Sequence, residues 1–156
     1  HKPSLGVIFV PSTNICYFAQ RGQGAYKQIG QTQPEVILSR AWKEARPITA
    51  VISRRHGMEE LKKFLAQFSR LNLLNCGSAL KFCWVAEGLA DIYPRFSPTF
   101  EWDTAAGQCI LNEAGGLVVD NTGQELQYNM SSSLQTANFL AIADKRHHWL
   151  HYLKSS

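Results

Sequence analysis

The pattern of apolar positions begins with three short, partly β-branched runs, at residues 5–10, 15–19 and 25–29. Proline, serine, asparagine and glycine punctuate the segments between them, which are residues 11–14 and 21–24. Short runs separated by turn-forming residues at this spacing are typical of antiparallel strands that follow one another in sequence. The first part of the chain is therefore predicted to form a β-meander.

A different pattern begins at residue 48, where a strand at 48–52 is followed by an amphipathic helix from residue 58 to about residue 71. Apolar residues in that helix recur at the three- and four-residue spacing that places them on one face. Strand and helix signals then alternate, which predicts an α/β fold with a mixed sheet and helices on its faces. The further strands are expected at 72–75, 89–93, 117–120 and 139–142, and the further helices at 79–87, 104–114 and after residue 144.

Composition narrows the class of protein. The chain has 156 residues, of which 45% are hydrophobic and 18% charged, and this balance argues against a disordered chain. No window approaches the roughly 20 apolar residues of a membrane-spanning helix. The four cysteines form no Cys-x-x-Cys pair, so we expect free thiols in a reducing compartment, the cytoplasm. The net charge of +4 suits a phosphorylated small molecule as well as nucleic acid.

Asp103 lies at a predicted junction between a strand and a helix, where a carboxylate has two common roles. It can cap the helix that follows by accepting a backbone N–H group. It can also bind a hard cation such as Mg²⁺, which prefers oxygen ligands. Spacing alone favours the cap, because one carboxylate does not make a magnesium site.

Three further segments place polar or basic residues at the ends of predicted elements. Ser78 and Lys81 lie at the start of a helix, where a hydroxyl, free N–H groups and an ammonium can bind an anion. Ser53-Arg-Arg-His56 follows a strand, at the position where open α/β sheets bind ligands. Arg95 follows another strand, and its flat guanidinium can stack on a base. The simpler alternatives are a helix cap beside a solvated lysine, a solvated loop and a surface arginine.

Taken in order, these segments resemble the bacterial 3′(2′),5′-bisphosphate nucleotidases, which belong to the inositol monophosphatase superfamily. The motifs that carry the resemblance are Gly77-Ser-Ala-Leu-Lys81, Ala86-Glu-Gly-Leu-Ala-Asp-Ile-Tyr-Pro-Arg95 and Trp102-Asp-Thr-Ala-Ala-Gly107. The resemblance covers nearly the whole chain. It implies a layered sheet-and-helix phosphatase fold, Mg²⁺ as the cofactor, and hydrolysis of adenosine 3′,5′-bisphosphate to AMP and phosphate, a reaction linked to sulfur assimilation.

The resemblance also implies a role for each candidate residue. Asp103 matches a metal ligand and is the expected catalytic residue. Ser78 and Lys81 match residues that hold the non-reacting phosphate of the nucleotide. His56 matches a residue that lines the nucleotide site, and Arg95 matches one that packs on the adenine.

One part of the family's pattern has no match in this chain. None of the 12 acidic residues lies in the Asp-Pro-x-Asp-Gly-Thr context that supplies other metal ligands. We therefore expect residues 1–47 to be strands from the sheet of an absent amino-terminal lobe plus a connection, and residues 48–156 to be the carboxy-terminal lobe. The absent half would then be a partner of this segment. The segment alone is expected to be inactive, with apolar strand faces exposed at 7–10 and 15–18.

Two other interpretations fit the same residues. One is an inositol monophosphatase-like hydrolase that acts on a sugar or inositol phosphate. The other is a non-catalytic fragment that binds adenine nucleotides or nucleic acid. Nucleic acid is not expected as a partner, because the charge of +4 is not gathered into a long basic stripe. The expected location is cytoplasmic, with peripheral attachment to the inner membrane left open.

Overall fold

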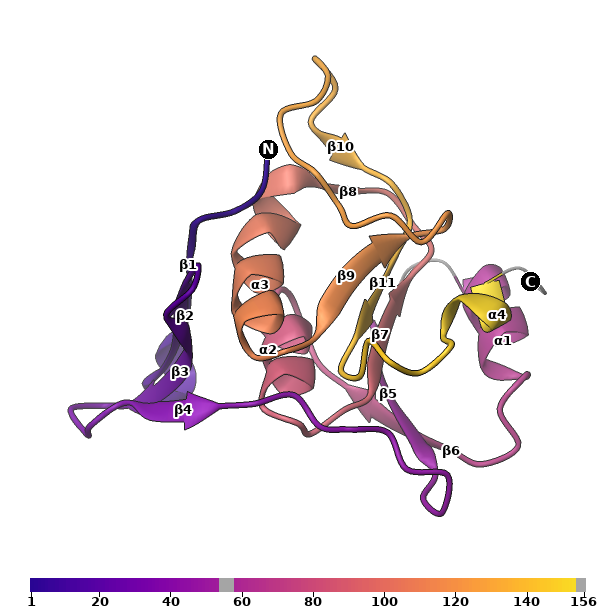
Figure 1. Cartoon of the computed structure of the whole chain (residues 1–156), viewed down its shortest axis with the longest axis horizontal. Helices are drawn as coiled ribbons and strands as arrows, with labels where there is room; N and C mark the ends of the chain where they lie inside the picture. Colours follow the sequence, from indigo (N-terminus) through magenta and orange to yellow (C-terminus); the bar gives the residue numbers. More distant parts are fainter. Residues whose placement is uncertain (54–57, 154–156) are drawn as a thin grey trace.

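The amino-terminal strands form an antiparallel sheet at one side of the molecule (Figure 1). In spatial order, they are β1 (Leu5–Val10), β2 (Ile15–Gln20), β3 (Gly24–Ile29) and β4 (Glu35–Ile37). The first three confirm the predicted meander. β4 lies in the segment that the sequence assigns to a connection, and it extends the sheet because it pairs with β3. The structure is a computed structural model and describes residues 1–53 and 58–153.

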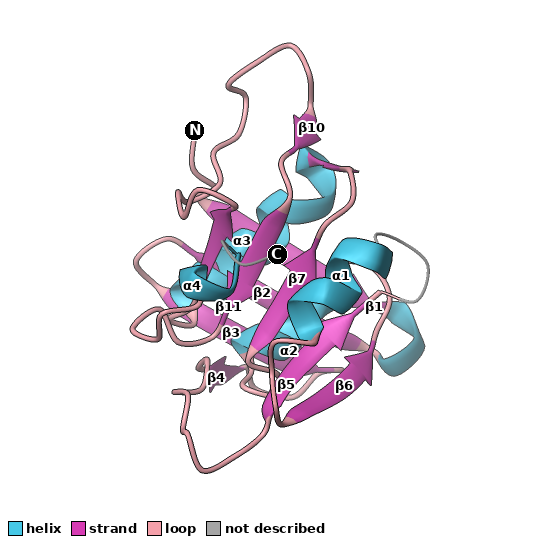
Figure 2. Cartoon of the chain, turned by 90° about the vertical axis from the view of Figure 1, so that its right-hand side faces the viewer, coloured by secondary structure: helices cyan, strands magenta, loops and turns pink. Residues whose placement is uncertain are grey.

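A second, mixed sheet lies at the centre of the rest of the chain (Figure 2). In spatial order, its strands are β6 (Leu71–Asn75), β5 (Ile48–Ile52), β7 (Ile92–Arg95), β11 (Phe139–Ile142) and β9 (Leu117–Asp120). β5 runs parallel to β6 and β7, whereas β11 is antiparallel to both of its neighbours. The predicted α/β class with a mixed sheet is confirmed.

Helices separate the two sheets and cover the far face of the second one (Figures 1 and 2). The inner pair is α2 (Leu80–Ala86) and α3 (Glu101–Glu113), and the outer pair is α1 (Met58–Leu65) and α4 (Leu150–Leu153). Both faces of β11 are buried, since Phe139 packs in the inner apolar cluster and Leu140 in the outer one. The order of layers is therefore sheet, helices, sheet, helices. Within the described ranges, no helix has the length and hydropathy that crossing a membrane requires.

Several element boundaries differ from the prediction, among them the start of α3, which is Glu101 and not residue 104. α1 ends at Leu65, well before Leu71, because Leu71 begins β6 and pairs in parallel with Ile48 of β5. β7 continues through Pro94, where the sequence predicts its end. Beyond Ile92 this strand pairs with β11 alone, so its other edge needs no N–H donor and accommodates a proline.

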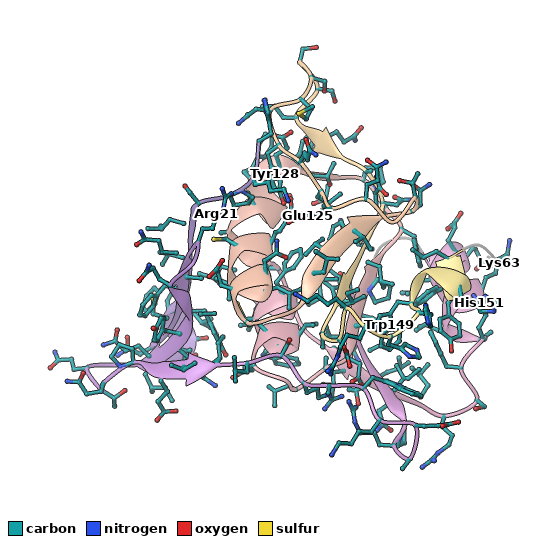
Figure 3. All side chains as sticks on the ribbon, viewed as in Figure 1. Arg21, Lys63, Glu125, Tyr128, Trp149 and His151 are labelled. Carbon is teal, nitrogen blue, oxygen red and sulfur yellow. The ribbon has the colours of Figure 1, made fainter. Side chains whose placement is uncertain are left out.

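A short two-stranded sheet lies beside the start of α3 (Figure 1). It pairs β8 (Thr99–Phe100) with β10 (Gln135–Thr136), and the sequence predicts neither strand because two residues show no period. The chain between β9 and β10 returns along α3, where the hydroxyl of Tyr128 donates to Gln108 at 2.7 Å (Figure 3). This contact fixes the returning segment, and with it β10, against the helix.

Small residues let α3 pack closely on two sides. A Cβ atom at Gly107 would lie 2.4 Å from the ring of Phe82 in α2. A Cβ atom at Gly6 of β1 would lie 2.5 Å from the carbonyl oxygen of Ala106. The small residues of the Trp-Asp-Thr-Ala-Ala-Gly motif therefore have a packing reason, because interiors are close-packed and α3 fits between α2 and β1 only without larger side chains.

Gly107→Ala is expected to lower the free energy of unfolding by about 1 to 2 kcal/mol, since crowding against Phe82 outweighs the gain in helix propensity. Urea unfolding followed by circular dichroism measures the change. Gly77→Ala is the matched control, because a Cβ atom there meets no heavy atom within 4 Å. Equal stability of the two variants would contradict this account of the motif.

Candidate functional site

Four of the five predicted site residues line one cavity of about 510 Å³. The cavity lies at the carboxyl ends of β5, β6 and β7, beside the start of α3. Open α/β sheets commonly bind ligands at this edge. The structure therefore brings together residues that are far apart in sequence, namely Ser78, Lys81, Arg95 and Asp103. The fifth residue, His56, lies outside the described residues.

Lys81 is a buried cation in this cavity. Its side chain lies on α2 and is 3% exposed, so the alternative of a solvated lysine is wrong. The ammonium donates to the carbonyl oxygens of Ser78 at 2.7 Å and Cys76 at 3.4 Å. It also lies 4.9 Å from the ring centroid of Tyr93. Burial lowers the pKa of Lys81 to about 8, and the nearby charge of Arg95 acts in the same direction.

Ser78 does not cap α2. The capping position is Ala79, with no side-chain cap, and Ser78 precedes it in the left-handed region at a φ of 53°. A non-glycine residue rarely adopts this conformation. Its carbonyl oxygen accepts the Lys81 ammonium, while the residue itself is exposed at the cavity. Ser78 and Lys81 are close together, as predicted. The contact is between the Lys81 ammonium and the backbone carbonyl of Ser78, and Ser78 is not part of the helix end.

Arg95 is the last residue of β7 and is fixed by the loop that follows it. Its guanidinium donates to the carbonyl oxygens of Ser97 at 3.2 Å and Pro98 at 3.1 Å, and to the hydroxyl of Ser53 at 3.5 Å. Arg95 is thus partly exposed, as the alternative of a surface arginine has it, but its guanidinium is held in one orientation. Hydrogen bonds made in the plane of a guanidinium leave its faces for stacking.

Asp103 lies inside the first turn of α3 and is not its cap. The helix begins at Glu101, and Phe100 holds the capping position because β8 ends there. Asp103 is exposed, and its Oδ2 accepts the hydroxyl of Thr99 at 2.9 Å. An anionic side chain in this turn is also stabilised by the helix dipole.

The donor set of this cavity fits one ligand position of a hard cation. Within residues 1–53 and 58–153, Oδ1 of Asp103 makes no hydrogen bond, so a carboxylate oxygen is available at the cavity. A complete Mg²⁺ site needs several oxygen ligands. The same described ranges contain no cluster of three histidine, cysteine or acidic side chains placed to hold a metal. Any further protein ligands would have to come from elsewhere.

Sequence reasoning missed three residues that line the same cavity. Ser53 and Tyr93 belong to the Ser53-Arg-Arg-His56 and Tyr93-Pro-Arg95 segments, but the sequence indicates no role for either of them. Burial raises the pKa of Tyr93 to about 12, so its phenol is neutral beneath Lys81. Thr99 shows no signal in the sequence, because its contact with Asp103 depends on where α3 begins. The helix starts at Glu101, directly after the two-residue strand β8.

Comparison with known proteins places this geometry in context. The model of the inositol monophosphatase family matches residues 1–152. The 3′(2′),5′-bisphosphate nucleotidase CysQ of Escherichia coli (strain K12) is 41% identical over 138 residues, which are 88% of this chain and 54% of that protein. CysQ of Aggregatibacter actinomycetemcomitans is 34% identical over 141 residues, 90% of this chain and 52% of that protein.

A solved structure agrees with these matches. The crystal structure of CysQ from Bacteroides thetaiotaomicron superposes with a TM-score of 0.80 at 35% identity, covering 92% of this chain and 59% of that one. The chain thus spans about half the length of the curated relatives it matches. The match to the CysQ structure shows that this chain has the same layered α/β fold over the part that is covered.

Proposed function

Because the chain belongs to the inositol monophosphatase family, we propose that the whole protein is a phosphatase that removes the 3′-phosphate of adenosine 3′,5′-bisphosphate, giving AMP and phosphate in sulfur assimilation. The observation that carries the proposal is the single cavity shared by Lys81, Arg95 and Asp103. Two cations and a carboxylate suit a ligand with two phosphates and a base, one phosphate being bound and the other removed. The names of the relatives, which are bisphosphate nucleotidases, support the same substrate.

Lys81 would hold the non-reacting phosphate, with Ser78 at the same edge of the cavity. An ammonium has three donors, and two of them are used by the carbonyl oxygens of Ser78 and Cys76. The third donor is available to a phosphate oxygen. Because Lys81 is buried, its charge is weakly screened and its bond to an anion is strong.

Arg95 would stack on the adenine, since its in-plane donors are already bound and fix the orientation of the plane. His56 would line the same nucleotide site. Support for its segment comes from Ser53, which lies on the cavity wall and accepts a hydrogen bond from Arg95. The predicted role of His56 itself stays a prediction.

Asp103 would supply one carboxylate oxygen to Mg²⁺, which is the proposed cofactor. When bound, Mg²⁺ polarises the phosphoryl group and activates water. Asp103, on the part of the cavity wall that α3 supplies, would be the residue that holds the cation. We also propose that residues 1–156 alone do not catalyse the reaction, because the described ranges supply no full set of ligands.

The partner that we propose for this segment is a further part of the same protein. The outer face of β1 exposes Leu5, Val7 and Phe9 by 61%, 53% and 54%. The intervening residues Ile8 and Val10 pack toward the core. An exposed apolar face of this kind usually marks an interface. The division into 1–47 and 48–156 remains part of this proposal, as does a cytoplasmic location, which the free cysteines support.

The proposal is tested by phosphate release from the whole protein in the presence of Mg²⁺. Adenosine 3′,5′-bisphosphate is expected to be hydrolysed with a higher kcat/KM than an inositol monophosphate, because only the nucleotide engages both Lys81 and Arg95. A preference for the inositol phosphate would favour the alternative of a sugar or inositol phosphate hydrolase. Binding of AMP without any hydrolysis would instead favour a non-catalytic nucleotide-binding protein.

A further inference from the structure

Thr99 is the residue that holds the carboxylate of Asp103. Its hydroxyl donates to Oδ2 of Asp103 at 2.9 Å. Thr99 is 8% exposed, whereas Asp103 is exposed at the cavity. We infer that Thr99 is a positioning residue, which orients Asp103 toward the metal ion. This inference rests on the proposed function of Asp103 as a metal ligand.

The backbone around Thr99 is fixed on both sides. Downstream, β8 pairs with β10, and the hydroxyl of Thr136 donates to the carbonyl oxygen of Thr99 at 3.4 Å. Upstream, the guanidinium of Arg95 binds the carbonyl oxygens of Ser97 and Pro98. The hydroxyl of Thr99 is thus presented from a rigid segment and not from a free loop.

The consequence for metal binding follows from the two oxygens of the carboxylate. The Thr99 hydroxyl has a single proton, and donating it to Oδ2 fixes the orientation of the Asp103 side chain. Within the described ranges, Oδ1 is then left free for a cation. Without the hydroxyl, the exposed side chain must be ordered when the metal binds. Loss of such an outer partner typically lowers metal affinity by about 10- to 100-fold.

The test is titration of the whole protein with Mg²⁺ alone, by isothermal calorimetry. Thr99→Val, which replaces the hydroxyl by a methyl group, is expected to weaken Mg²⁺ binding by about 10- to 100-fold. Thr99→Ser keeps the hydroxyl and is expected to retain most of the affinity. Thr136→Val is the matched control, because it removes a hydroxyl from the adjoining strand without touching Asp103.

The outcomes separate the inference from the function on which it rests. Unchanged Mg²⁺ affinity in Thr99→Val, together with weak binding by Asp103→Asn, would overturn the role of Thr99 and leave Asp103 as a ligand. Unchanged affinity in Asp103→Asn would overturn the proposed metal site itself. Equal weakening in Thr99→Val and Thr136→Val, with equal losses of thermal stability, would show that Thr99 acts only through folding. Weakening in Thr99→Val alone, rescued by serine, supports the inference.

Discussion

Asp103→Asn in the whole protein is expected to lower kcat for adenosine 3′,5′-bisphosphate by about 100- to 1000-fold, because a metal ion stabilises the transition state by several kcal/mol. Asparagine keeps the size of the side chain and one oxygen, so the change tests the negative charge. Phosphate release measured over a range of Mg²⁺ concentrations gives both kcat and the metal dependence. The loss is expected to be smaller at high Mg²⁺ if weaker binding is its main cause.

Glu101→Gln is the control for Asp103→Asn. Glu101 lies in the same turn of α3, but its carboxylate accepts the backbone N–H of Asn129 at 3.0 and 3.1 Å. It does not line the cavity. Turnover and Mg²⁺ dependence are therefore expected to stay near those of the unsubstituted protein. If Asp103→Asn also leaves both unchanged, the assignment of Asp103 is wrong.

Lys81→Met is expected to raise KM for the nucleotide by about 10- to 100-fold, since a charge-assisted hydrogen bond is worth about 1.5 to 3 kcal/mol. Methionine fills the buried space beside Tyr93 without a charge. Hydrolysis of an inositol monophosphate, which has no second phosphate to bind, is expected to change little. Lys63→Met on the exposed surface of α1 is the control (Figure 3). A similar loss with both substrates would show that Lys81 does not recognise the second phosphate.

The same lysine predicts a pH dependence. Burial holds the pKa of Lys81 at about 8, below its usual value, so the free protein loses this positive charge as the pH rises through that value. An anionic phosphate binds the charged form, and kcat/KM for the nucleotide is therefore expected to fall above about pH 8. In Lys81→Met, this fall is expected to disappear. Persistence of the fall would assign it to another group.

The strands of this protein were predictable where side-chain pattern decides the structure. β-Branched residues mark β1, β5 and β9 clearly in the sequence. The remaining boundaries are decided by strand pairing between segments that are distant in sequence. Leu71 satisfies the helical spacing of α1, yet it begins β6 because Ile48 lies beside it. The predicted start of α3, residue 104, is wrong for a similar reason, since the strand β8 that precedes Glu101 has only two residues and pairs with the distant β10.

In the candidate site, too, the residue types were predictable from the sequence and their contacts were not. The residue types at Ser78, Lys81, Arg95 and Asp103 indicate phosphate and metal chemistry, and the structure places all four in one cavity. Their immediate partners were not predictable. The burial of Lys81 involves neighbours that are distant in sequence, such as Tyr93 of β7. Whether Asp103 caps a helix or faces a ligand depends on a boundary set by β8.

The close packing of α3 bears on how substitutions far from the cavity would act. The helix that carries Asp103 at one end is wedged against β1 at Gly6 and against Phe82 of α2 at Gly107. A larger residue at either glycine would displace the whole helix, including the first turn, which carries Asp103. Substitutions that crowd α3 are therefore expected to affect the cavity even when they lie far from it.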